Sequence, residues 1–213
     1  AAAIADLFVG LTLSGLAMEF HGTSRPASGA EHQIAHMWEM ESLMQDGERV
    51  SHGACVSVGT MASLSLHDWI AAQDLTALDV DAVVAAAPSL GRKREMIGAT
   101  LPPALAEKAI AETEAKHVDG EALRARLERL RTVWPTLQAR LGSHLMRAPQ
   151  MAALLAKAGA PVLPADIGID DRRLYDTILA ARFIRSRYTV LDLIEECGLL
   201  EAALEGALPI RRA

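Results

Sequence analysis

The sequence is poor in aromatic residues, in cysteine and in positive charge. Aromatic residues make up 4% of the 213 positions, while alanine and leucine, which favour helix, are abundant. The net charge of −6 excludes a protein that wraps nucleic acid, because that function needs a basic face. The two cysteines, Cys55 and Cys197, are too few for a disulfide framework and fit no metal knuckle. They predict reduced thiols in a cytoplasmic protein.

The first twenty residues form an apolar run about as long as a membrane span. Asp6 and Glu19 interrupt this run, Gly10 and Gly15 dilute it, and no basic segment precedes it. These features argue against a secretory signal and against a membrane span. The segment is therefore expected to be a buried core helix.

Helical periodicity recurs along the chain, and no segment shows convincing strand alternation. The sequence therefore predicts an all-α, multi-helix bundle that forms a single domain over residues 1–213. Ser28 and Glu31 have the spacing of a capping box, Ser51 is a second N-cap candidate, and Gly198 can end a helix. The expected helices cover residues 1–19, 28–46, 52–72, 104–116, 120–141, 146–158, 171–185 and 190–197.

Three of the seven histidines lie close together in the sequence: His32, His36 and His52. His32 and His36 are four residues apart, so they share one helix face and could hold a single metal ion. An ordinary structural pair stays open as the alternative. Gln33 stands where a zinc metalloprotease needs its general-base glutamate, which excludes that class. His52 begins the next helix beside Gly53, where a ligand or a second backbone can approach closely.

The loop before residue 30 carries Ser24, Arg25 and Ser28 and leads into a helix N-terminus. Hydroxyl groups, a guanidinium and free backbone N–H groups together favour an anion such as a phosphate or a carboxylate. The alternative is a capped turn whose arginine pairs with an acidic neighbour. The dipeptide His67-Asp68 also occurs in metal-dependent phosphohydrolases, but alone it is weak evidence.

Four stretches together carry a family resemblance: SGLAMEFHGTSRPASGAEHQIAHMWEM, SHGACVSVGTM, GAPVLPADIGI and ARFIRSRYTVLDLIEECGLL. They resemble the glycerol-1-phosphate dehydrogenase branch of the iron-containing alcohol dehydrogenase and dehydroquinate synthase superfamily. The match covers roughly residues 10 to 200, in the correct order. SRPASGAEH is its most specific part.

The resemblance implies a helical, metal-binding C-terminal domain that follows a Rossmann-like NAD(P)-binding domain. In such enzymes one aspartate and two histidines hold a divalent metal. Carried over by motif, His32 and His52 would be the metal ligands, and His36 would act catalytically beside the nicotinamide or the substrate. Ser24, Arg25 and Ser28 would contact the substrate, although this assignment rests more on local anion chemistry than on the family.

Two elements of the family pattern are not found in this sequence: the upstream aspartate ligand and the glycine-rich nucleotide loop. The chain is therefore expected to be a C-terminal fragment that is inactive alone, and no cofactor-binding residue is assigned. His52-Gly53-Ala54 also departs mildly from the HGE or HGQ that is common in the family.

The activity implied is reduction of glycerone phosphate, a phosphorylated triose, to sn-glycerol 1-phosphate in phospholipid biosynthesis. NADH or NADPH would be the reductant. Zinc is the expected metal, with nickel or iron as alternatives, because imidazole suits all three. Two alternatives remain open: a non-catalytic helical interaction module, or a sister activity such as glycerol dehydrogenase or a dehydroquinate-synthase-like cyclase. An exposed apolar face would favour a homo-oligomer.

Overall fold

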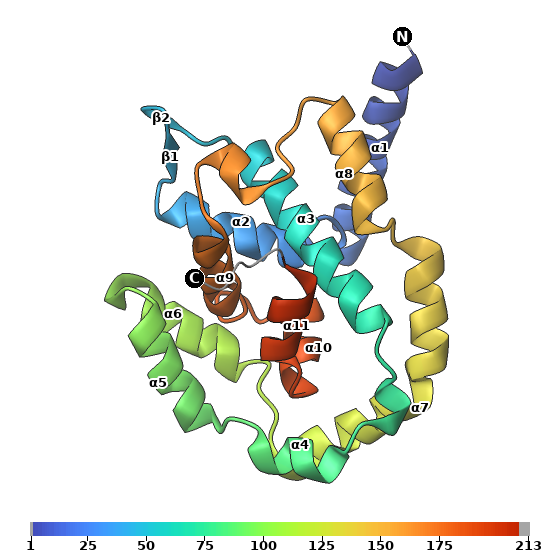
Figure 1. Cartoon of the computed structure of the whole chain (residues 1–213), viewed down its shortest axis with the longest axis vertical. Coiled ribbons are helices and arrows are strands. Elements are labelled where there is room, and N and C mark those ends of the chain that lie inside the picture. Colours follow the sequence, from blue (N-terminus) through green and yellow to red (C-terminus); the bar gives the residue numbers. More distant parts are fainter. Residues whose placement is uncertain (1, 209–213) are drawn as a thin grey trace.

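The structure is a computed structural model that describes residues 2–208, and it confirms the all-α prediction (Figure 1). Within these residues β-structure is limited to two short strands, β1 (Met44–Gln45) and β2 (Glu48–Arg49). Short 3-10 turns lie at η1 (Arg25–Ala27), η2 (Leu75–Ala77) and η3 (Pro164–Ile167). The helices are α1 (Ala2–His21), α2 (Ala30–Met40), α3 (His52–Ala71), α4 (Val80–Ala86), α5 (Leu90–Thr100), α6 (Pro103–Glu114), α7 (Gly120–His144), α8 (Ala148–Lys157), α9 (Asp171–Ala181), α10 (Val190–Glu196) and α11 (Leu200–Ala207).

Helix α3 runs through the middle of the molecule and contacts α2, α8, α10 and α11 (Figure 1). Its apolar side chains Leu66 and Ile70 are fully buried. Trp38 of α2 is also fully buried, and its indole N–H donates to the Thr177 hydroxyl on α9 over 2.9 Å. These contacts fix α2 between α3 and α9, so the histidines of α2 have a rigid base.

The connection between α2 and α3 is a hairpin, where the sequence was expected to continue as helix to residue 46. β1 pairs with β2 in antiparallel register, with Met44 opposite Arg49. The two residues between the strands, Asp46 and Gly47, have φ values of 51° and 84°. Asp-Gly is a strong signal for this kind of two-residue turn, so the local sequence favours a hairpin here over a longer helix.

The two predicted helix starts on either side of the hairpin had different outcomes. The Ser51 hydroxyl accepts the N–H of Ala54, so this predicted N-cap is confirmed. The capping box of Ser28 is wrong, because α2 starts one residue later with Gly29 at its N-cap position and no side-chain cap. Glu31 instead accepts the N–H of Gly29 over 2.6 Å.

Several other element boundaries also differ from expectation. Helices α4, α5 and α11 were not predicted, and α7 ends at His144, three residues after the expected end. Helix α9 ends at Ala181, four residues before the expected end, and a turn follows. Gly198 has a φ of 70° directly after α10, which confirms its role at a helix end.

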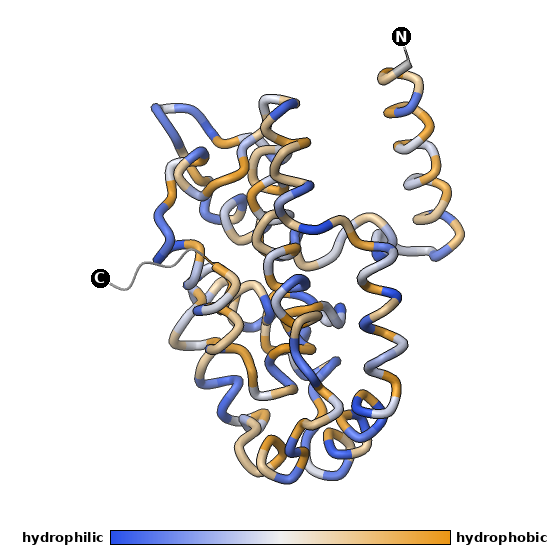
Figure 2. The backbone as a smooth tube through the Cα atoms, turned by 45° about the vertical axis from the view of Figure 1, so that its right-hand side comes forward, coloured by the Kyte–Doolittle hydropathy of each residue, from blue (hydrophilic) through white to orange (hydrophobic). Residues whose placement is uncertain are grey.

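Helix α1 is not buried, which corrects the prediction of a core helix. It projects from the bundle, and its apolar residues are spread along the projecting segment (Figure 2). Phe8 is 71% exposed and Phe20 is 90% exposed. The stretch Ala3–His21 is long and apolar enough to cross a membrane by length and composition, and none of its most apolar window is buried. The absence of a membrane span therefore stays a prediction.

Candidate functional site

The structure brings together the three histidines that were close in sequence. His32 and His36 lie one turn apart on α2, and His52 is the first residue of α3. The ring centroids of His32 and His52 are 5.4 Å apart. The ring of His36 lies 6.0 Å from that of His32 and 6.1 Å from that of His52. The tight packing of α2 on α3 produces this cluster from two separate elements.

Each of the three imidazoles directs Nδ1 toward a carboxylate. Glu31 contacts Nδ1 of His32 over 2.9 Å, and Glu39 contacts Nδ1 of His36 over 2.7 Å. Glu39 also contacts Nδ1 of His52 with its other oxygen. Within residues 2–208, the structure gives no hydrogen-bond partner for Nε2 of any of these rings. Carboxylates that hold one ring nitrogen while the other faces a metal are a recurring arrangement.

The two carboxylates are held in their charged form by these contacts. Burial would raise the pKa of Glu39, but hydrogen bonds from His52 and His36 outweigh it and lower the pKa. Burial likewise opposes the net lowering of the pKa of Glu31, which results from hydrogen bonds from the Gly29 N–H and His32. Each carboxylate therefore stays an acceptor for its histidines at neutral pH.

Imidazole nitrogens are suitable ligands for a divalent cation, and one pair of the three rings is also close enough together to share one. Two imidazoles on a tetrahedral zinc, with Zn–N bonds of about 2 Å, have ring centroids about 5 Å apart. His32 and His52 are close to that value, whereas both separations of His36 are larger. In the described part of the chain, no group of three or more His, Cys, Asp or Glu side chains is arranged to hold a metal ion. These residues can therefore supply two ligands, and further ligands would have to come from elsewhere.

A cavity of about 270 Å³ lies beside the histidine cluster, at the start of α2. Arg25 and Ser28, two of the predicted substrate residues, line it. Ser24, the third, accepts a hydrogen bond from the Arg187 guanidinium at the cavity wall over 3.2 Å. Glu31 lines the cavity and also contacts His32, so it joins the cavity to the histidine cluster.

Sequence reasoning missed two residues of this cavity. Arg187 comes from the turn between α9 and α10, 163 residues after Ser24, so no local pattern could place it. His67 of α3 was weighed only as part of an HD dipeptide, yet it lines the cavity with Ser63. The positions of both depend on how α3 and the 182–189 turn pack against the start of α2.

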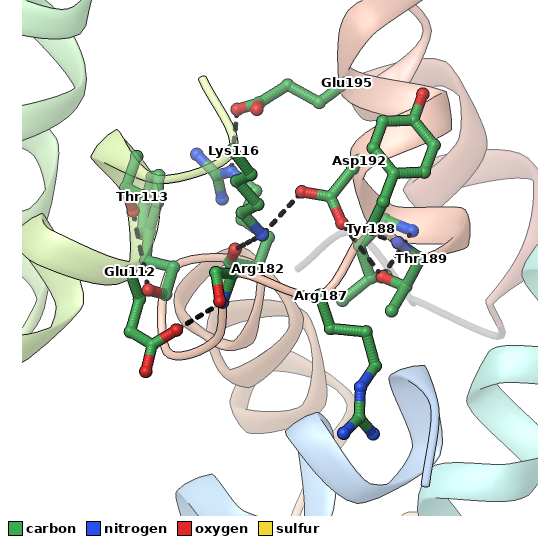
Figure 3. Close-up of polar contacts among 12 residues, drawn as sticks. Glu112, Thr113, Lys116, Arg182, Arg187, Tyr188, Thr189, Asp192 and Glu195 are labelled. Carbon is green, nitrogen blue, oxygen red and sulfur yellow. Dashed lines mark hydrogen bonds and ion pairs between the residues drawn. The ribbon is translucent and has the colours of Figure 1, made fainter. Parts of the chain in front are cut away.

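A buried ionic network holds the turn that carries Arg187 (Figure 3). Lys116 contacts Asp192 over 2.6 Å and donates to the backbone carbonyl of Arg182 over 2.6 Å. Glu112 accepts the N–H of Ser186 over 2.6 Å, and Asp192 accepts the N–H of Thr189 over 2.8 Å. The turn is thus fixed at several points, which limits the conformations open to Arg187.

These features define an all-helical domain that carries a cluster of imidazoles beside a cavity with two arginines. Comparison with known proteins gives a specific set of relatives. Over 94% of its length the chain is 26% identical to a glycerol-1-phosphate dehydrogenase [NAD(P)+] from Bacillus licheniformis. Over 90% of its length it is 29% identical to the protein of that name from Geobacillus thermodenitrificans. A 57-residue segment is 49% identical to the one from Halalkalibacterium halodurans.

The resemblance inferred from the four sequence stretches is therefore confirmed, and the chain is related to these oxidoreductases over nearly its whole length. It spans 37–38% of the length of these two long-matching relatives. No family model matches the chain. No solved structure matches it significantly.

Proposed function

We propose that this chain forms the helical, metal-binding domain of an NAD(P)-dependent glycerol-1-phosphate dehydrogenase, with residues 1–213 as a single domain. The observation that carries the proposal is the convergence of His32 and His52, from two helices, at a spacing suited to one cation. The names of the relatives support the reaction class and the nicotinamide cofactor. Zinc is the proposed ion, and nickel and iron have the same ligand preference for imidazole.

In this proposal a bound cation would polarise the carbonyl oxygen of glycerone phosphate, and NAD(P)H would supply the hydride. The residues of this chain would bind the cation and the substrate and hold the imidazole rings in orientation. Glu39 and Glu31 fix the ring orientations of His52 and His32 through Nδ1, so that Nε2 stays available. His36, held by the same Glu39, would lie beside the ion and could exchange a proton with the substrate oxygen.

The substrate-binding assignment of Arg25 and Ser28 is supported by their position in the lining of the cavity next to this cluster, and that of Ser24 by its hydrogen bond with Arg187, which also lines the cavity. The proposed location is the cytoplasm, which the two free, buried cysteines, Cys55 and Cys197, support. A cyclase-like or glycerol dehydrogenase activity has weaker support, because the relatives carry the glycerol-1-phosphate dehydrogenase name.

A second candidate, a helical interaction module, is favoured by one observation. Helix α1 exposes large apolar side chains on all its sides, including Ile4, Leu7 and Leu11, each more than 60% exposed. Such a surface normally contacts another protein or a membrane. An interaction module has no need for histidines oriented by carboxylates, so metal binding separates the two candidates.

Zinc binding to the chain is expected to depend on His32 and His52. His32→Ala and His52→Ala should each weaken binding of Zn²⁺ at least tenfold, because each removes one ligand of a two-histidine site. Isothermal titration with Zn²⁺, and visible absorption with Co²⁺ as a probe, would measure the effect. In an active enzyme that contains this chain, His52→Ala should abolish NAD(P)H-dependent reduction of glycerone phosphate.

The control is His144→Ala, which removes an exposed histidine at the end of α7. This variant should bind Zn²⁺ like the unchanged chain. If His32→Ala, His52→Ala and His144→Ala all bind Zn²⁺ with equal affinity, the proposed metal site is wrong.

A further inference from the structure

The cavity at the start of α2 contains two arginines that no carboxylate neutralises directly. Arg25 and Arg187 both line it, and within residues 2–208 neither guanidinium forms an ion pair. The Nε atom of Arg187 is buried and has no hydrogen-bond partner, and its Nη2 atom donates only to the neutral Ser24 hydroxyl. A buried guanidinium atom without an acceptor is costly, so this position suits a ligand that brings acceptor oxygens.

The electrostatics of the cavity favour an anion. Burial lowers the pKa of the Arg187 guanidinium, the charges of Arg25 and Arg185 lower it further, and Glu31 acts in the opposite direction. Glu31 is the one carboxylate of the cavity lining, and it is already engaged by the Gly29 N–H and His32. An anion between the two arginines would relieve their mutual repulsion and satisfy their free N–H groups.

His67 adds a different kind of group to the cavity wall. Its Nδ1 contacts the backbone carbonyl of Ser63 over 2.8 Å, which requires the hydrogen to be on Nδ1. Burial lowers the pKa of this ring, so it is uncharged at neutral pH and its Nε2 is an acceptor. A ligand hydroxyl could donate to this atom while the anionic group occupies the arginine side.

The volume sets the size of the ligand. About 270 Å³ lies at the lower end of the range for small-molecule sites, enough for a phosphate and a short carbon chain. Figure 3 shows Arg187 pointing away from the buried ionic network, toward the helices below it. The cavity reaches the histidine cluster through Glu31, which contacts His32.

We propose that Arg187, together with Arg25, binds the phosphate group of a small phosphate monoester in this cavity, and that His67 accepts a hydrogen bond from the same ligand. This proposal rests on the proposed function only for the identity of the triose to which the phosphate group is attached. Arg187 thereby becomes a residue that selects phosphorylated over unphosphorylated substrates. The orientation would place the other end of the ligand toward His32.

The test is binding of glycerone phosphate, inorganic phosphate, acetate and unphosphorylated glycerone to the chain, in the presence of a chelator and measured by isothermal titration. Both phosphate compounds are expected to bind, and acetate and unphosphorylated glycerone are expected to bind at least tenfold more weakly. Arg187→Gln should weaken binding of both phosphates at least tenfold. Arg187→Lys, which keeps the charge but loses the planar fork, should weaken it less.

The matched control is Arg172→Gln, which removes the same charge from an exposed helix position that pairs with Asp176. It should leave phosphate binding unchanged. Equal phosphate affinity in Arg187→Gln and Arg172→Gln would overturn the proposal, as would acetate binding as tightly as phosphate. If Arg187→Gln does not fold, the Arg25→Gln and Arg187→Lys variants carry the same test.

The failures of the two proposals can be distinguished. If phosphate binding does not depend on Arg187 but Zn²⁺ binding depends on His32 and His52, the phosphate-site proposal is wrong and the metal-site proposal stands. If phosphate binding depends on Arg187 but Zn²⁺ binding does not depend on His32 and His52, the dehydrogenase proposal is wrong and the phosphate-site proposal stands. In an active enzyme, Arg187→Gln is expected to lower kcat/KM for glycerone phosphate at least tenfold, mainly through KM.

Discussion

Replacing Glu195 with glutamine is expected to lower the free energy of unfolding by about 3–5 kcal/mol, because it removes the negative charge that neutralises two buried cations. Glu195 accepts from Lys93 Nζ over 2.6 Å and from Arg182 Nε over 2.9 Å. The side chains of Lys93 and Arg182 are only 11% and 3% exposed. Equilibrium unfolding in urea, followed by circular dichroism, would measure the loss.

The matched control is Glu95→Gln, which breaks an ion pair with Arg92 on the surface of α5. Both side chains of that pair are more than 60% exposed, so the change should cost less than about 0.5 kcal/mol. Similar losses in Glu195→Gln and Glu95→Gln would mean that the buried network contributes no more than a surface pair.

The effect of Glu195→Gln should also depend on pH. Burial would raise the pKa of Glu195, but the charges and hydrogen bonds of Arg182 and Lys93 outweigh it and lower the pKa. A carboxylate with a lowered pKa stabilises the fold above its unfolded pKa, and this contribution is lost as pH falls through the folded value. The difference in stability between the unchanged chain and Glu195→Gln should therefore shrink in acid below about pH 4.

Replacing Gly59 with alanine is expected to destabilise the fold by about 3 kcal/mol, at the upper end of the usual cost of overpacking. The added methyl group would lie 2.5 Å from the backbone carbonyl oxygen of Glu31. The Glu31 carbonyl belongs to the backbone of α2 and cannot turn aside as the tip of a side chain could, so α2 and α3 would have to move apart. Because His32 directly follows Glu31, the variant should also bind Zn²⁺ more weakly. Urea unfolding and Zn²⁺ titration would measure the two effects.

Gly53→Ala is the control on the same helix. No atom lies within 4 Å of a methyl group added at Gly53, so this change should be neutral or stabilise the helix by up to about 1 kcal/mol. If Gly59→Ala is as stable as Gly53→Ala, the close contact of the two helices is not a structural requirement.

The fold could be predicted where the signal was local. Ser51 could be identified as the N-cap of α3 because a capping side chain acts within a few residues of the helix start. The exposure of α1 could not be predicted in this way. Its composition matches that of a core helix, and whether such a helix is covered depends on what packs on it. The short helix α4 offered too little periodicity to identify.

The residues of the site also differ in whether local sequence could predict them. His32 and His36 could be paired from their spacing, since one helix carries both. His52 was joined to them through the family resemblance, and the packing of α2 on α3 gives the physical reason. Arg187 and His67 reach the cavity only through long-range packing, so neither the matching stretch around Arg187 nor the His67-Asp68 dipeptide could place them there.

Glu39 supports two rings with one carboxylate, which couples them energetically. Removing either imidazole frees an oxygen that the remaining ring or solvent can use, so the losses from His36 and His52 are not additive. Replacing His36 and His52 together should consequently cost less stability than the sum of the two single replacements. Replacement of Glu39 alone would leave both rings without their carboxylate partner at once.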